Sequence, residues 1–185
     1  MGGEPKYVVQ PLGDQNRAAF HCGDKELDGY FLERASRDVR EKIAAVFVLL
    51  TEEDKNSVFG YYTLSNQEID AGELPSALTK KTGKYRKLPA TLIGRLAVSK
   101  AHQGCKLGEF LLIDALKRAL EATGSVMSFA VVVDAKGEQV IAFYEKYGFM
   151  RLSGTRLFLP MKTIEKTFPS INKTSELDPQ GSSKT

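Results

Sequence analysis

Hydrophobic residues recur along this chain with two different spacings. Short runs rich in apolar and β-branched residues predict strands at 6–12, 43–50, 57–64, 91–98 and 128–134, and a final strand could form at 156–162. Apolar positions also repeat at helical spacing behind Asp24, whose carboxylate can cap a helix start. The same spacing returns over 107–123 and 137–147, where Gly148 ends the pattern.

The order of these elements predicts the fold class. A strand, a helix and a second strand follow one another over 91–134, so we expect a parallel βαβ unit with a right-handed crossover. The strands before it are expected to be antiparallel. The pattern therefore predicts an α/β (α+β) domain over residues 1–168, with a mixed, mostly antiparallel sheet and flanking helices.

Two stretches lack a regular pattern. The segment 73–89 contains two prolines and little periodicity, and it reads as a long loop that could hold one helical turn. The end of the chain, 169–185, is mostly polar and charged, which predicts disorder.

Composition excludes several classes of protein. The 185 residues suit one domain with a single core, and a net charge of +3 is too small to imply nucleic-acid binding by itself. No apolar run is long enough to cross a bilayer and no signal peptide is visible, so no membrane partner is expected. Cys22 and Cys105 stand apart without metal-ligand spacing, so we expect free thiols, no metal, and a cytoplasmic location.

The junction between the strand at 91–98 and the next helix carries the most specific local pattern. The turn at 102–108 contains Gly104 and Gly108 and runs directly into the helix. Such a turn directs unpaired backbone N–H groups at one point, where the helix dipole adds positive potential. It can bind a phosphate or a pyrophosphate, although the same glycines also fit a plain structural connection.

Two motifs make the chain resemble the GNAT superfamily of acetyl-CoA-dependent N-acetyltransferases. Gln103 and Gly108 match the first and last positions of that family's pyrophosphate loop, Arg/Gln-x-x-Gly-x-Gly/Ala, whereas Lys106 replaces the middle glycine. The segment 143–149 is similar to the family's Phe-Tyr-x-x-x-Gly-Phe ending. The resemblance covers most of the chain and implies the GNAT fold and acetyl-CoA as cosubstrate.

The chain is most similar to one branch of this family, the tRNA-acetylating toxins of type II toxin–antitoxin modules. The stretches that carry the likeness are 20–23, 27–31, 60–65 and 88–98. The resemblance implies acetylation of the α-amine of the amino acid carried on tRNA, which blocks translation. It also implies a ribbon-helix-helix antitoxin as partner and a homodimer as a common assembly.

The resemblance further implies which residues bind the cofactor. The thioester and pantetheine would lie along Leu96, Ala97 and Val98, which would otherwise read as an ordinary core strand. The diphosphate would lie on the loop formed by Gln103, Gly104, Cys105, Lys106, Leu107 and Gly108. The Cβ of Lys106 requires a loop conformation open to non-glycine residues, and its ammonium could supply a cation to the phosphates.

Tyr144 is the residue that the resemblance implies as the acid that protonates the departing CoA thiolate. Phe143 and Tyr147 fit better as an aromatic face packed on the sheet. No general base stands out, although Asp70 or Glu73 beside the long loop could serve. An α-amine has a pKa of about 8 and needs less help than a lysine amine at about 10.4, which mildly favours an aminoacyl acceptor.

The long loop also carries the densest basic stretch of the chain. Five cations lie within it without an acid among them: Lys80, Lys81, Lys84, Arg86 and Lys87. A solvated loop is the plain interpretation, but beside an active site this stretch becomes a candidate track for tRNA phosphates, with Tyr85 available to stack on a base. Arg95 could contact the 3′ end of the RNA.

These features together favour an aminoacyl-tRNA acetyltransferase of the toxin branch. Two alternatives remain open at this point. One is an acetyltransferase that acts on a small-molecule amine or a protein N-terminus, and the other is a CoA-binding module without catalytic activity.

Overall fold

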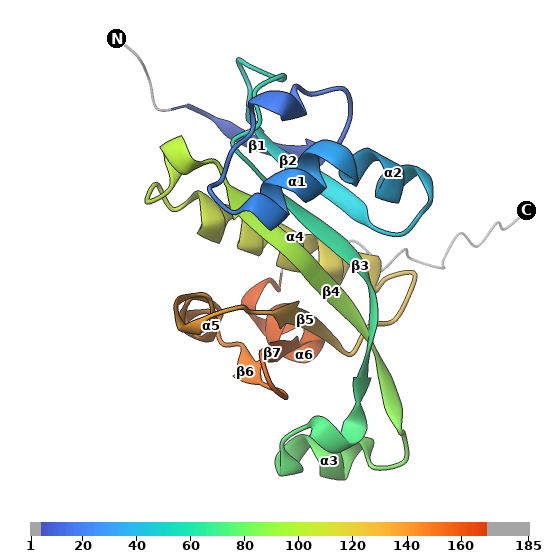
Figure 1. The fold of residues 1–185 in the computed structure, drawn as a ribbon. Helices are drawn as coiled ribbons and strands as arrows, with labels where there is room; N and C mark the ends of the chain where they lie inside the picture. Colours follow the sequence, from blue (N-terminus) through green and yellow to red (C-terminus); the bar gives the residue numbers. More distant parts are fainter. Residues whose placement is uncertain (1–4, 170–185) are drawn as a thin grey trace, which may run out of the picture.

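The computed structural model describes residues 5–169, and within them one mixed sheet organises the chain (Figure 1). Its strands run in the order β1-β2-β3-β4-β5-β7-β6. They are β1 (Tyr7–Pro11), β2 (Ala45–Thr51), β3 (Gly60–Asp70), β4 (Lys87–Val98), β5 (Ala130–Asp134), β6 (Met150–Arg151) and β7 (Arg156–Pro160). The tail predicted to be disordered lies outside the described residues from position 170 onward.

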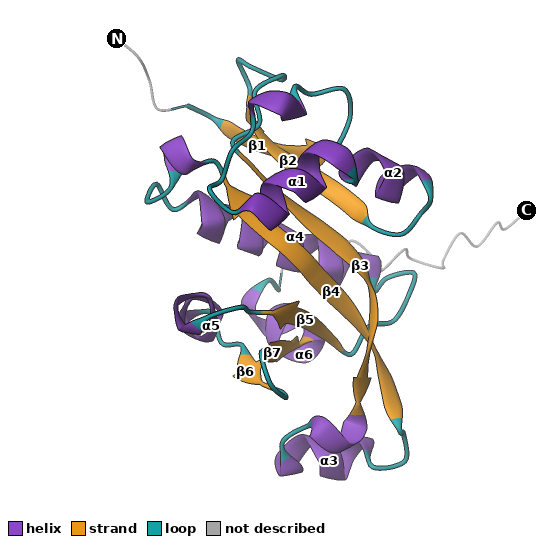
Figure 2. Cartoon of the chain, in the orientation of Figure 1, coloured by secondary structure: helices purple, strands orange, loops and turns teal. Residues whose placement is uncertain are grey.

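Helices cover both faces of this sheet (Figure 2). They are α1 (Lys25–Glu33), α2 (Ala35–Arg40), α3 (Ser76–Thr82), α4 (Leu107–Ala122), α5 (Glu138–Lys146) and α6 (Met161–Thr167). Two of them, α1 and α2, lie over one face, whereas α4, α5 and α6 pack on the other. None of these helices combines the length and hydrophobicity that crossing a bilayer requires.

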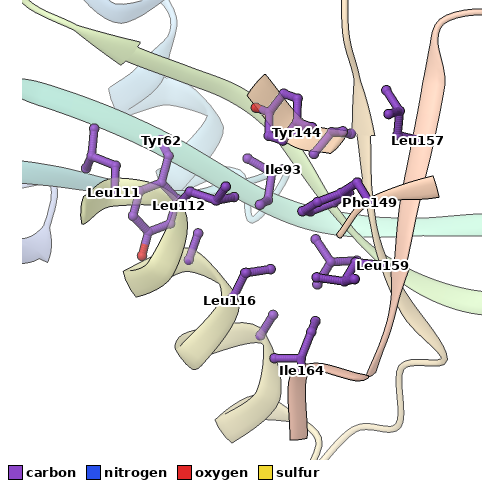
Figure 3. Close-up of a cluster of buried hydrophobic side chains, with 14 of the residues drawn as sticks. Tyr62, Ile93, Leu111, Leu112, Leu116, Tyr144, Phe149, Leu157, Leu159 and Ile164 are labelled. Carbon is purple, nitrogen blue, oxygen red and sulfur yellow. The ribbon is translucent and has the colours of Figure 1, made fainter. Parts of the chain in front are cut away.

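The largest hydrophobic cluster lies under α4 and α5 (Figure 3). Leu111, Leu112 and Ala115 repeat at helical spacing and are fully buried, so one face of α4 lies flat on the sheet. A separate aromatic cluster under α1 includes Phe31 stacked on Tyr61 at 4.4 Å between ring centroids. The two clusters fix α1 and α4 on opposite faces of β3 and β4.

The strand β4 has different neighbours along its length. It pairs antiparallel with β3 throughout, but it pairs with β5 only over Ala90–Ile93, in parallel. The predicted parallel βαβ unit and the mostly antiparallel sheet are therefore confirmed. Beyond Ile93, β4 and β5 separate and leave a gap, which we call the fork.

The structure corrects the predicted loop at 73–89. Its centre is the helix α3, and the flanking strands reach Asp70 and Lys87, so the segment is the tip of a long β3–β4 hairpin. We call the tip, residues 71–86, the arm. The strand β3 was predicted to stop at 64 because polar residues follow, but Ile69 near its end is fully buried.

Three further elements differ from the predictions. The first helix divides near Arg34 into α1 and α2. The two-residue strand β6 was missed because two residues carry no periodicity. The predicted strand at 156–162 ends at Pro160 and continues as α6, where Met161 and Ile164 bury one helix face.

Candidate active site

A bulge in β4 opens the fork. Thr63 pairs with Arg95 and the next residue of β3, Leu64, pairs with Ile93, so Gly94 is an extra residue in β4. A Cβ on Gly94 would lie 3.2 Å from the Thr63 Oγ1, which is tighter than an ordinary contact. Glycine therefore fits the bulge at the position where β4 turns away from β5.

The bulge leaves backbone groups of β4 unpaired. The Ser99 N–H donates to the Phe59 carbonyl at 2.8 Å, and N–H groups alternate in direction along a strand. The N–H groups of Leu96 and Val98 therefore face away from β3 and into the fork. There they are available to a bound molecule.

A cavity of about 350 Å³ lies beside this stretch, on the α4 side of the sheet. We call it the loop cavity. Its lining residues are Val98, His102, Gln103, Gly104, Lys106, Leu107, Gly108, Glu109, Phe143, Lys146 and Tyr147. The structure thus brings the predicted phosphate loop together with the end of β4 and with the aromatic face of α5.

The start of α4 is built to receive an anion. Lys106 precedes the helix with φ 60° and ψ 14°, the left-handed conformation, and no side chain caps the first turn. The N–H groups of Leu107, Gly108 and Glu109 therefore lack carbonyl partners within the helix. Lys106 keeps a backbone conformation that glycine adopts more readily, at a cost of about 1 kcal/mol, and it lines the loop cavity.

The side chain of Gln103 holds the loop in place. Its Nε2 donates to the Cys22 carbonyl at 2.8 Å and to the Val98 carbonyl at 3.1 Å. Two of the predicted cofactor residues line neither the loop cavity nor the second cavity, which occupies the fork. The side chain of Ala97 is buried towards α1, and Cys105 is exposed.

A second cavity, of about 190 Å³, occupies the fork itself. We call it the fork cavity. It is lined by Asp24, Glu26, Leu27, Ile93, Gly94, Arg95, Leu96, Asp134, Lys136, Val140 and Tyr144. Since α1 covers one face of the sheet and α5 packs on the other, this cavity passes through the sheet. Leu96 lines it and Val98 lines the loop cavity, so the two cavities flank one short stretch of β4.

Tyr144 is almost completely buried, yet it lines the fork cavity. Its ring packs against Phe149 at 5.2 Å between centroids, and its hydroxyl points away from Phe149 and Leu157 (Figure 3). No hydrogen bond of this hydroxyl is present within residues 5–169. Burial raises the pKa of Tyr144 well above its ordinary value, so the phenol stays protonated.

Arg95 is held at the fork by the aromatic cluster under α1. Its guanidinium lies 3.6 Å from the centroid of the Tyr30 ring, a close cation–π contact. Burial and the negative charge of Asp38 raise the pKa of Tyr30 to about 12, so the ring remains neutral. Arg95 is the one predicted RNA-contacting residue that lines the fork cavity.

The remaining basic residues lie elsewhere. Lys80 and Lys81 are on α3, and the strand from Lys87 to Arg95, eight residue steps long, spans about 25 Å. The sequence analysis expected the basic stretch beside the active site, but the structure places it on the arm and at the start of β4, away from the fork. Lys87 is also paired with Glu68 at 2.7 Å.

The two carboxylates suggested as general bases are also on or next to the arm. Asp70 accepts a hydrogen bond from the Gly72 N–H at 2.9 Å, and Glu73 accepts one from the Ser153 hydroxyl at 3.0 Å. Neither lines the fork cavity. Asp70 is held at the base of the arm, whereas Arg156 lies between Glu73 and Asp134, at 3.8 Å from each.

Apart from Arg95, sequence reasoning did not assign to the site the charged residues that line the fork cavity. Asp24 and Glu26 come from the start of α1, whereas Asp134 ends β5 and Lys136 follows it, more than a hundred positions later. Asp134 could have been found, because it ends an entirely apolar run at the carboxyl end of a parallel strand. No local signal connects it with Asp24 or Glu26.

Comparison with known proteins identifies relatives over most of the chain. The model of the acetyltransferase (GNAT) family matches residues 14–149. The chain is 28% identical to a Sinorhizobium fredii protein named "Probable toxin TacT", over 88% of this chain and 95% of that protein. It is 29% identical to a Mycobacterium tuberculosis "tRNA-acetylating toxin", over 71% of this chain and 76% of that protein.

Solved structures of similar fold bear names of the same kind. AtaT complexed with acetyl-methionyl-tRNAfMet has a TM-score of 0.81 at 29% identity, covering 88% of this chain and 99% of that chain. An AtaT variant bound to the C-terminus of the antitoxin AtaR and acetyl-CoA has a TM-score of 0.74 at 26% identity, covering 89% and 99%. The fold, the open phosphate loop and the family match agree, and the chain belongs to the GNAT family of acetyltransferases.

Proposed function

We propose that this acetyltransferase moves the acetyl group of acetyl-CoA onto the α-amine of the amino acid carried on tRNA, and so acts as a toxin that blocks translation. The observation that carries the proposal is the pair of cavities at the fork. One presents free helix amides, and the other presents a buried tyrosine hydroxyl that has no hydrogen-bond partner in the described part of the chain. The tRNA-acetylating relatives and the AtaT–tRNA complex support the choice of acceptor.

The loop cavity is the proposed site for the CoA moiety. The diphosphate lies on the N–H groups of Leu107, Gly108 and Glu109, with the Lys106 ammonium beside it. The pantetheine runs along β4, where the Leu96 and Val98 N–H groups can bond to it in place of the missing strand partner. Gln103 serves through its backbone, because its side-chain amide is already engaged.

The reaction then takes place in the fork cavity. The neutral amine attacks the thioester carbon, a C–N bond forms, and an unpaired β4 amide stabilises the oxyanion. The C–S bond breaks, the nitrogen loses a proton, and the sulfur takes the proton of the Tyr144 hydroxyl, which solvent restores. The products are N-acetylaminoacyl-tRNA and CoA.

The raised pKa of Tyr144 refines its role. A thiol has a pKa of about 8.5 and an ordinary tyrosine about 10, so transfer to the thiolate is already uphill, and burial increases the difference. Tyr144 therefore acts first as a hydrogen-bond donor to the sulfur and completes the transfer only as the C–S bond breaks.

The RNA is proposed to contact two separate regions. Arg95 at the fork meets the 3′ end, and the cations of the arm, Lys80, Lys81, Lys84 and Arg86, meet phosphates farther along the acceptor stem. A duplex carries one phosphate per ~1.7 Å of axis, so a stem lying along β4 presents many charges over the ~25 Å between these regions. Lys87 contributes less, because Glu68 already neutralises it.

The biological partners follow from the same proposal. An antitoxin is expected to neutralise the protein, in keeping with the AtaT–AtaR complex. We assign it to the ribbon-helix-helix type and place the enzyme in the cytoplasm, where charged tRNA is found.

Transfer of labelled acetyl groups tests this proposal. Acetyl-CoA labelled in the acetyl group is mixed with the protein and either freshly charged bulk tRNA, the same tRNA after removal of its amino acids, or polyamines and peptides. The proposal predicts label only in charged tRNA. Label in polyamines or peptides with none in charged tRNA would overturn the choice of acceptor. CoA binding without any transfer would overturn the enzymatic function.

A further inference from the structure

We propose that Asp134 is the general base of the transfer, the group that takes the proton from the attacking amine. The inference rests on the proposed function and adds to it the catalytic group that neither the sequence motifs nor the family match identifies. It is carried by the position of Asp134 at the fork and by the hydrogen bonds of the other carboxylates there.

Asp134 stands at the point where the two strands separate. The last β4–β5 pair joins Ile93 to Val133, so Asp134 is the first residue of β5 beyond the pairing. It lines the fork cavity together with Leu96 and Tyr144. Val133 packs in the same cluster as Tyr144, and side chains alternate along a strand, so Asp134 and Tyr144 line this cavity from opposite faces of the sheet.

The other two carboxylates of the fork cavity are already engaged. Asp24 accepts hydrogen bonds from the N–H groups of Glu26 and Leu27 at 2.8 and 3.1 Å, which cap α1. Glu26 accepts one from the Lys136 ammonium at 3.0 Å. Asp134, by contrast, has no side-chain hydrogen bond within residues 5–169.

Arg156 balances the charge of Asp134 without occupying its oxygens. The Arg156 Nε lies 3.8 Å from the Asp134 Oδ1, beyond hydrogen-bond distance, and this buried nitrogen has no hydrogen-bond partner among residues 5–169. The guanidinium is held from the other side by the Glu68 carbonyl at 3.3 Å and by Glu73 at 3.8 Å. Asp134 therefore has a counter-charge nearby, while its lone pairs stay free to accept an N–H.

The chemistry suits a carboxylate because the proton becomes acidic only during the reaction. A free ammonium with a pKa of about 8 holds its proton too tightly to give it to a carboxylate. Once the neutral amine has bonded to the carbonyl carbon, however, the nitrogen carries positive charge and its N–H becomes far more acidic. Asp134 takes that proton, Tyr144 gives its own to the sulfur, and solvent restores both groups.

Chemical rescue tests this assignment. Asp134→Ala removes the carboxylate and leaves space at the fork, into which formate can diffuse. We expect kcat with charged tRNA to fall about 100-fold, and added formate to restore it severalfold, with sodium chloride at equal ionic strength as control. Acetyl-CoA affinity and the melting temperature should stay near those of the wild-type protein.

Two further variants distinguish a base from a structural residue. Asp134→Asn keeps the shape but fills the space, so its kcat should fall similarly without any response to formate. Glu145→Ala removes an equally exposed carboxylate, paired with Arg151 on the α5 surface and outside both cavities, and should retain wild-type kcat.

Either of two results would overturn the assignment: undiminished turnover by Asp134→Ala, or a loss that formate does not recover. Rescue of Glu26→Ala instead of Asp134→Ala would move the role to Glu26 and equally overturn it. If the wild-type protein fails to acetylate charged tRNA at all, the failure belongs to the proposed function and not to Asp134.

Discussion

Two helices, α1 and α4, begin next to the fork, and their first turns differ in charge. At the start of α1, the Asp24 carboxylate accepts from two of its amides, and Glu26 and Asp28 add further negative charge. At the start of α4, no side chain caps the amides, and the preceding residue is Lys106. The first helix start is closed to anions, whereas the second is open to them.

This difference in charge determines which end of the site attracts the cofactor and which attracts the amine. An anion such as a diphosphate is attracted to α4, and a positively charged or polar amine is attracted to the carboxylates near α1. Both helix starts adjoin the short stretch Leu96 to Val98. A cofactor whose diphosphate is held at α4 and an amine held near α1 would therefore meet in the fork. The comparison predicts that substitutions at the start of α4 weaken cofactor binding, whereas substitutions between the two helix starts lower the rate of acetyl transfer.

The largest effect is expected between the two helix starts, at Tyr144. Tyr144→Phe removes the hydroxyl and keeps the ring that packs on Phe149. We expect kcat to fall about 100- to 1,000-fold while acetyl-CoA affinity, measured by calorimetry, changes less than about twofold. Undiminished turnover would remove Tyr144 from the acid role.

The next largest effect tests the contrast directly by giving α4 an acid like those of α1. At Gly108, an added Cβ would meet Phe143 and Val98 at ordinary distances of 3.9 Å, so Gly108→Asp fits the structure. Its carboxylate would stabilise the helix start by about 0.3–1 kcal/mol but repel a diphosphate. We expect acetyl-CoA to bind at least about tenfold more weakly with an unchanged or higher melting temperature.

Gly108→Asn is the matched control, because it has the same shape without the charge. Its acetyl-CoA affinity should remain close to that of the wild-type protein. Equal weakening by Asn and Asp would show that bulk, and not charge, governs this position.

A smaller effect is expected at the arm, which lies far from both helix starts. Replacing Lys80, Lys81 and Lys84 with Ala should raise the KM for charged tRNA about tenfold at moderate salt. The slope of log affinity against log salt should fall by about 0.7–0.9 for each phosphate that the arm no longer neutralises. Fluorescence titration at several salt concentrations measures both quantities.

A second triple variant provides the control for net charge, because it also removes three positive charges. It replaces Lys55, Lys162 and Lys166 with Ala, and all three are exposed and lie outside the arm and both cavities. The KM for charged tRNA and the salt slope should both change more in the arm variant than in this control. Identical salt slopes in the two triple variants would show that the arm contributes only general charge.

The smallest effect is expected at Lys106. Lys106→Gly relieves the left-handed backbone conformation by about 1 kcal/mol, but glycine also gains entropy in the unfolded chain. The free energy of unfolding should therefore change by less than about 1 kcal/mol. Acetyl-CoA binding should weaken severalfold and depend less on salt, and unchanged binding would limit Lys106 to a backbone role.

The same contrast explains what could be predicted from the sequence. The anion site at α4 is built largely from backbone amides, so a contiguous segment from Gln103 to Gly108 specifies it and leaves a motif. The order of β4, α4, β5 and α5 was likewise predictable, because each element has its own hydrophobic periodicity.

The acceptor side could not be predicted in this way. Asp24, Arg95 and Asp134 meet only because α1 packs over the fork and because Gly94 inserts a bulge. Pairing across the sheet creates this proximity, and no local pattern records it. The arm was misjudged for a related reason, since the polar half of β3 is stabilised by its pairing with β4 and not by its own composition.

A crystal structure with acetyl-CoA tests the central claim most directly. The account predicts the diphosphate on the amides of Leu107 and Gly108, the thioester beside the Leu96 N–H, and the sulfur within hydrogen-bond distance of the Tyr144 hydroxyl. A cofactor bound with its thioester outside the fork, or with the Tyr144 hydroxyl out of reach of the sulfur, would contradict it.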